Sequence, residues 1–186
     1  LSDAPSQAAI QKLSTHSDSD VRGLFAREAP VLDHETFLIL AGDEHWAVRW
    51  AVAGRDDLPG GLLHTLAGDE HGAVRKDVAG RDDLPGELLH TLAGDEHGAV
   101  RERVAGRNDL TGEVLHTLAQ DQDQAVRMRV AERDDLPDDL MRERIVQEPD
   151  KEIRDIFNRS AKGRNRSIPL TSRIMSWIPG VGQRRN

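Results

Sequence analysis

Apolar positions recur along the chain at a fixed interval, so the sequence is first of all a repeat. The segment Leu-Ala-Gly-Asp-Glu-His occurs three times with a period of 26 residues. A fourth copy keeps this spacing, and a degenerate copy flanks the regular ones on each side, offset by 27 residues. Positions in every unit are numbered from its first apolar residue, taken as position 0. The units begin at Leu13, Leu40, Leu66, Leu92, Leu118 and Ile145.

The first half of each unit predicts an amphipathic helix. Position 8 is Val or Ile in every unit and position 12 is Val or Phe, and a spacing of four places both on one helix face. The aspartate at position 3 suits an N-cap, and the glycine at position 14 is of the kind that commonly ends a helix (Gly54, Gly80, Gly106).

The second half opens with Pro and continues as Leu-Leu-His-Thr-Leu-Ala, which predicts a second, shorter helix. A unit of this size cannot bury its apolar face alone, but stacked units can. We therefore predict an all-α solenoid of about five full units over residues 1–158, without β-sheet. Residues 6–13 form a leading cap helix, and the partial unit at 145–158 supplies a trailing one. Residues 159–186 form a separate tail.

The pattern Leu-Ala-x-Asp-x-x-x-x-Val-Arg-x-x-Val-Ala, followed by Pro and Leu-Leu, resembles the leucine-rich repeat variant family over roughly residues 13–158. The resemblance implies alternating α-helices and short 3₁₀ helices wound into a right-handed superhelix. A cysteine-ligated iron–sulfur module found beside the repeats of one family member does not carry over, because this chain has no cysteine. The family is defined by its shape, so the resemblance implies no particular activity.

The amino-acid composition further limits the kind of core, the cellular location and the charge distribution that we expect. Only 37% of the residues are hydrophobic and 3% are aromatic, which predicts a thin, aliphatic core. The chain has no long apolar run and no signal-peptide core near residue 1, so we expect a cytoplasmic protein. The net charge of −8 divides unevenly: residues 159–186 carry +7 and residues 1–158 carry −15. An acidic body with a basic tail is the informative part of this balance.

The repeated charged residues are interpreted as structural. Position 9 is arginine in every unit, and its spacing from the position-3 acid is similar to the Asp/Arg pair of HEAT repeats, which implies hydrogen bonds between neighbouring units. A second arginine column follows the end of the first helix, where a cation interacts favourably with the helix dipole (Arg55, Arg81, Arg107, Arg133).

Two histidine columns carry the other repeated candidate chemistry (His45, His71, His97; His64, His90, His116). Histidines one repeat apart are about 9–10 Å from each other, too far to share a metal ion bound at about 2.1 Å. We therefore expect no metal and no cofactor. No catalytic motif is present in the sequence either, and we expect no enzyme activity.

Departures from the repeat are the candidate binding residues. At positions 6 and 10, where most units carry small or polar residues, one unit has Trp46 and Trp50, four apart on one helix face. Met128, Arg103 and Arg129 occupy positions 10 and 11 of later units. Such residues match the composition of interface anchors. The alternative is that the Trp pair packs under the irregular N-terminal unit, whose Phe25 and Phe37 are also aromatic.

The tail is the second departure. Residues 160–167 have the composition of a linker, and a short amphipathic helix opening at Pro169 would place Trp177 on its apolar face with Arg173 beside it. Three interpretations stay open: the tail folds back on the acidic body, docks on a partner, or binds anionic lipid or nucleic acid.

The leading hypothesis is a non-catalytic, monomeric scaffold whose solenoid surface binds a protein or peptide. The alternative is a nucleic-acid-binding or DNA-repair protein of the HEAT-like repeat type. The −15 charge of the body argues against this alternative, because phosphate binding depends on clustered Lys and Arg. Only the basic tail suits nucleic acid. An enzyme of unknown type is a third alternative, for which the sequence nominates no residue.

Overall fold

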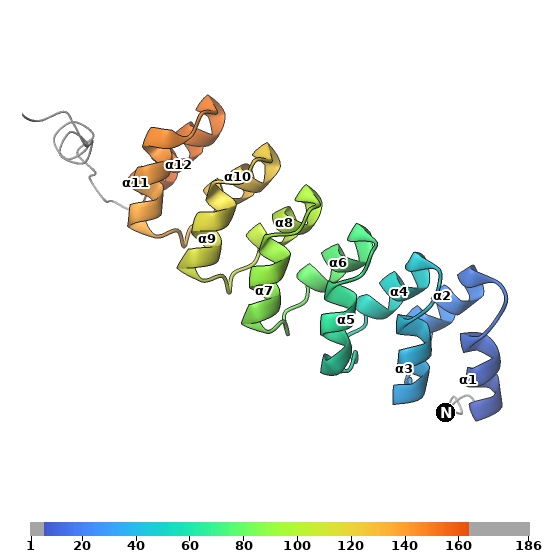
Figure 1. The fold of residues 1–186 in the computed structure, drawn as a ribbon. Coiled ribbons are helices and arrows are strands. Elements are labelled where there is room, and N and C mark those ends of the chain that lie inside the picture. Colours follow the sequence, from blue (N-terminus) through green and yellow to red (C-terminus); the bar gives the residue numbers. More distant parts are fainter. Residues whose placement is uncertain (1–5, 164–186) are drawn as a thin grey trace, which may run out of the picture.

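The computed structural model describes residues 6–163 as a single row of helix pairs (Figure 1). Twelve α-helices and one 3₁₀ turn make up this part of the chain, and it contains no strand. The predicted all-α solenoid of five two-helix units, between a leading and a trailing helix, is confirmed. The tail residues Arg173 and Trp177 lie outside the described residues. None of the described helices combines the length and apolar content needed to cross a membrane.

The helices form two layers. The inner layer contains the first helix of every unit and the trailing helix: α2 (Ser19–Glu28), α4 (Trp46–Ala53), α6 (Gly72–Ala79), α8 (Gly98–Ala105), α10 (Gln124–Ala131) and α12 (Lys151–Gly163). The outer layer contains the leading helix and the second helices: α1 (Gln7–Ser14), α3 (His34–Ala41), η1 (Gly60–Leu62) with α5 (Leu63–Ala67), α7 (Gly86–Ala93), α9 (Gly112–Ala119) and α11 (Asp138–Gln147). Neighbouring helices contact one another more extensively in the inner layer than in the outer one. The row must therefore curve with the inner layer on its concave side.

The core lies between the layers and is built from the repeated apolar columns. The position-8 and position-12 valines of α4, α6, α8 and α10 are at most 1% exposed, and so are the position-0 leucines at the ends of α3, α5, α7 and α9. These columns stack from one unit to the next, which is why a core almost without aromatic residues suffices for a body of this length.

The second helices differ from the family expectation. Apart from η1, they are α-helical, and α7 and α9 each have eight residues. The 3₁₀ turn occurs where Gly60 and Gly61 stand together. Consecutive glycines cost about 1 kcal/mol each relative to alanine in an α-helix, which favours a tighter first turn.

The N-cap prediction for the first helices is wrong by two residues. The caps of α4, α6 and α8 are the position-5 histidines, and the position-3 aspartate accepts a hydrogen bond from the backbone N–H of that histidine, as Asp69 does from His71 at 2.8 Å. The prediction that glycine ends these helices is confirmed, because Gly54, Gly80 and Gly106 are their C-caps.

Two further corrections concern the C-terminal units. The core place of the position-0 leucine is taken by Arg144, which is buried and pairs with the fully buried Glu148 at 2.5 Å, while Ile145 is only half-buried. The extra residue of this unit lengthens α11 to ten residues. Helix α12 continues past the expected body end at 158 to Gly163, because Ala161 still packs into the core, so the first residues of the expected linker are helical.

Candidate functional site

The position-9 arginines are bound inside the row. Arg75 of α6 pairs with Asp95 of the next unit through two bonds, from Nε to Oδ2 at 2.6 Å and from Nη2 to Oδ1 at 2.9 Å. Its Nη1 donates to the carbonyl oxygens of Asp69 and Glu70. The same arrangement recurs along the row, which confirms the predicted inter-unit bonds. We call these pairs the ladder: Arg22–Asp43, Arg49–Asp69, Arg75–Asp95, Arg101–Asp121 and Arg127–Glu148.

The ladder also sets the protonation of its aspartates. Burial by itself raises the pKa of Asp95, but the hydrogen bond from Arg75, the backbone amide of His97 and the Arg75 charge together hold this pKa below its ordinary value. The pKa values of the other ladder aspartates are lowered for the same reasons. These charges neutralise each other in pairs, and neither member is available to a ligand.

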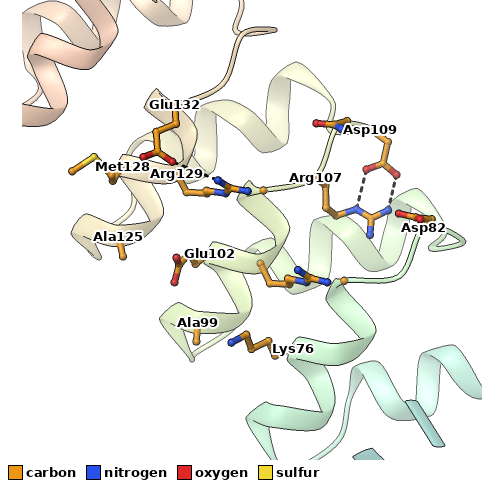
Figure 2. A pocket seen from close by; sticks show the side chains of 14 residues that line it. Lys76, Asp82, Ala99, Glu102, Arg107, Asp109, Ala125, Met128, Arg129 and Glu132 are labelled. Carbon is orange, nitrogen blue, oxygen red and sulfur yellow. Dashed lines mark hydrogen bonds and ion pairs between the residues drawn. The ribbon is translucent and has the colours of Figure 1, made fainter. Parts of the chain in front are cut away.

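The second arginine column has partners that the sequence analysis missed. Arg107 is buried and forms two bonds to Asp109 (Figure 2). Its Nη1 donates to the carbonyl oxygen of Ala79 in the preceding unit, at 3.1 Å. The motif Arg-x-Asp carried this signal, because its aspartate is kept in four units while the middle residue changes from Asp to Asn108. This column is therefore a second set of inter-unit bonds.

The inner helices meet along seams, which place the variable positions next to one another. At the three seams between α4, α6, α8 and α10, position 6 of one helix faces position 5 of the next, and position 14 faces position 11. Gly72 lies under the ring of His97, Gly98 under Asp123, and Gly106 under Arg129. A side chain at these glycines would collide with its neighbour, so small residues at positions 6 and 14 allow the next unit's side chain to lie across the helix.

The first of these seams, between α4 and α6, is different because position 6 is Trp46. Its ring stacks on the ring of His71, with centroids 4.1 Å apart and planes 5° from parallel. Trp46 keeps 39% of its surface exposed and Trp50 keeps 37%. Phe25 and Phe37, in contrast, are core residues. Trp46 thus stacks on a residue of the following unit. Both Trp residues contribute exposed aromatic surface to the inner layer.

A groove of about 870 Å³ crosses the inner surface of α6, α8 and α10 (Figure 2). Three of the residues nominated from the sequence line it, namely Met128, Arg103 and Arg129. Trp46 and Trp50 lie on α4, the helix beside α6, and do not line the groove. The structure thus divides the nominated residues between an aromatic ridge on α4, formed by Trp46 and Trp50, and this adjacent groove.

The groove has mixed charge. Lys76 and Glu102 line it at position 10, and neither was nominated from the sequence because a charged residue on an exposed helix position is ordinary. Glu132 closes one end, 3.5 Å from Arg129. The lining therefore alternates cations, carboxylates and the half-buried thioether of Met128, which suits a ligand with both polar and apolar groups.

The histidine columns form no metal site in the described part of the chain, where no three potential ligands gather. Instead the histidines contact neighbouring residues, as His64 Nε2 contacts Glu87 Oε1 at 2.7 Å.

Comparison with known proteins bears on the fold. No protein-family model and no curated protein matches the chain. A solved structure described as a leucine-rich repeat variant with a novel repetitive protein structural motif is similar, with a TM-score of 0.68 and 33% sequence identity. The match covers 81% of this chain but only 59% of that one, so the chain spans less than two thirds of the length of the protein it resembles. In both fold and sequence, the chain is similar to a leucine-rich repeat variant, as its repeat pattern indicated.

Proposed function

We propose that the chain is a non-catalytic repeat scaffold that binds a protein or peptide segment across its inner layer. The proposal rests on the positions at which the repeat units differ in sequence. Their core and ladder positions are nearly identical, whereas positions 6, 10 and 11 change from unit to unit, and these positions gather on the inner surface. Variation concentrated on one face of an otherwise regular row is typical of a surface that recognises something irregular.

The shape and chemistry of this surface fit an extended peptide. The groove is open and polar and runs across three helices, so it suits a peptide better than a compact apolar molecule. The Trp pair next to it supplies exposed aromatic area of the kind that dominates interface energies. A segment lying along the inner layer would meet both the aromatic ridge and the groove.

Nucleic-acid binding has less support. Among the groove residues, Lys76, Arg103 and Arg129 are offset by Glu102 and Glu132, and the body as a whole carries −15. Binding to phosphate requires a net excess of cations along the contact surface. A gel shift at low salt with single- and double-stranded DNA and RNA tests this alternative directly.

The proposal is tested by using the full chain as bait and identifying captured proteins, then repeating the capture with Trp46→Ala and Trp50→Ala. We expect each change to lower recovery of a specific partner at least several-fold. Leu38→Ala is the matched control, since Leu38 is a 50% exposed apolar residue on the outer layer. Recovery that falls equally for Leu38→Ala, or for no variant, would argue against binding at the inner layer.

A further inference from the structure

The C-terminal ends of the inner helices carry a recurrent arrangement of charge. At α8, the guanidinium of Arg129 from the next unit lies over Gly106, with Nε 2.9 Å from the place of a β-carbon. At α6, Arg103 lies over Gly80 in the same way. A cation is favourable there, because the last carbonyl groups of a helix point outward and its C-terminus has partial negative charge.

Helix α4 departs from this arrangement. The residue over its C-cap Gly54 is Asp77, whose Oδ2 lies 3.5 Å from the place of a β-carbon. A carboxylate at a helix C-terminus is electrostatically unfavourable. The Asp77 carboxylate has no hydrogen-bond or ion-pair partner among residues 6–163.

The neighbouring cations do not compensate for Asp77. Arg55 and Arg81 are held in two-bond pairs by Asp57 and Asp83. Arg81 also donates to the carbonyl oxygen of Ala53 at the end of α4. The equivalent arginines make the same contact at the ends of α6 and α8, so this bond does not distinguish α4 from those helices. Lys76, the adjacent cation, forms no ion pair with Asp77.

The end of α4 is also less covered than the ends of α6 and α8. Gly54 is exposed, whereas Gly80 and Gly106 are only half-exposed, because aspartate is shorter than the arginine found in the later units. Trp50 lies one helical turn before Gly54 on the same face, with 37% of its surface exposed. A carboxylate and an exposed aromatic residue thus lie beside one exposed helix end.

We propose that this place, formed by Trp50, Gly54 and Asp77 and here called the α4 slot, receives an arginine or lysine side chain of the bound segment. It rests on the proposed function and names the chemistry that one part of the partner must have. The bound cation would take the place that Arg103 and Arg129 take at the next two helix ends. Arginine fits best, since its planar group can pair with a carboxylate through two bonds and stack on an indole ring.

The test starts from a random dodecapeptide library displayed on phage and selected on the immobilised full-length chain. We expect the selected peptides to share an arginine or lysine. The dissociation constant of one selected peptide is then measured by fluorescence anisotropy with the wild type, Asp77→Asn and Asp77→Arg. Each substitution should weaken binding about tenfold, and replacing the peptide's arginine with citrulline should weaken binding to the wild type similarly but hardly affect binding to Asp77→Arg.

Two controls separate charge from folding. Glu113→Gln removes an exposed carboxylate on α9, in the outer layer and away from the groove, and should leave affinity unchanged. Asp77→Arg reproduces the residue found at this position in the next two units, so it should fold and melt at or above the wild-type temperature.

The outcomes distinguish the two proposals. Selected peptides that bind through Trp46 and Trp50 but whose affinity is indifferent to Asp77 and to their own cations would overturn the α4 slot and leave the scaffold function standing. Failure to select any binding peptide, together with unchanged partner capture by the Trp variants, would overturn both. Selected peptides that match residues 168–179, which contain Arg173 and Trp177, would support the slot and identify its occupant as a segment of this chain or of a second copy.

Discussion

The bond between Arg75 and Asp95 in the middle of the ladder provides the sharpest test of what holds the row together. Both side chains are less than 10% exposed, and Arg75 makes two bonds to Asp95 and two to backbone carbonyl oxygens of its own unit. Arg75→Met keeps much of the apolar side-chain volume but removes these four bonds and a fifth, from Nη2 to Glu96 Oε1 at 3.1 Å. It leaves a buried carboxylate without its counter-charge.

The expected loss in the free energy of unfolding is about 3–5 kcal/mol, the usual cost of removing one partner from a buried pair. This is a large part of the roughly 5–15 kcal/mol that stabilises a typical domain. Asp95→Asn should be less costly, because an asparagine oxygen can still accept the bond from the His97 amide. Since each single change already breaks the pair, the double variant should lose about 2–3 kcal/mol less than the sum of the two.

The assay is urea denaturation followed by circular dichroism and by Trp fluorescence. In a Trp177→Phe background the remaining tryptophans, Trp46 and Trp50, lie on α4, before the broken contact, so fluorescence reports on the N-terminal units. In a row with nearest-neighbour coupling, we expect the two signals to separate in Arg75→Met, although they coincide in the wild type. Lys76→Met, which removes an exposed cation from the same helix, is the matched control and should change stability by about 0.5 kcal/mol or less.

A loss below about 1 kcal/mol for Arg75→Met, with additive single and double variants, would refute this reasoning. Stability would then come from the stacked apolar columns, and the ladder would contribute only to the register of neighbouring units.

Three further predictions follow from the described contacts. The ladder aspartates have lowered pKa values in the folded state. The stability that they give the folded chain should therefore be complete above their ordinary pKa of about 4 and be lost as the pH falls below it. Urea midpoints measured from pH 7 to pH 2.5 test this. Asp33 has its pKa lowered to about 2, first by the hydrogen bond from Gln7, so Gln7→Ala should raise this pKa, as carboxyl NMR shifts against pH would record. Leu66→Ala should cost about 2–5 kcal/mol because Leu66 is fully buried, whereas Leu38→Ala should cost much less; thermal melting distinguishes them, and equal losses would contradict the core assignment.

Features encoded by spacing were predictable from the sequence. The position-8 and position-12 columns identified the core faces, and the arginine six residues after each acid identified the ladder. Arg144 was not predictable, because an arginine in a leucine column looks like an offset of the repeat until its buried partner Glu148 is seen. The family expectation of 3₁₀ helices held only where two glycines, Gly60 and Gly61, weaken the α-helix.

The candidate site was predictable in part, because Trp46, Trp50 and Met128 interrupt otherwise repeated columns. The groove was not, since it depends on how neighbouring helices cross. Asp77 could not be identified as a binding residue from the sequence, because single charged residues are ordinary on a helix surface. Its position over Gly54 acquires meaning only beside the arginines that take the same place in the next units.

The ladder also has a consequence for how such a chain can change its length. Each ladder bond is donated by one unit and accepted by the next. Removing a whole unit, such as residues 66–91, would bring Arg49 opposite Asp95 and leave no charge unmatched. Gene duplication or deletion in steps of 26 residues therefore conserves internal bonding while it lengthens, shortens or reorders the recognition surface. The near-identity of the central units is what such a history would leave behind.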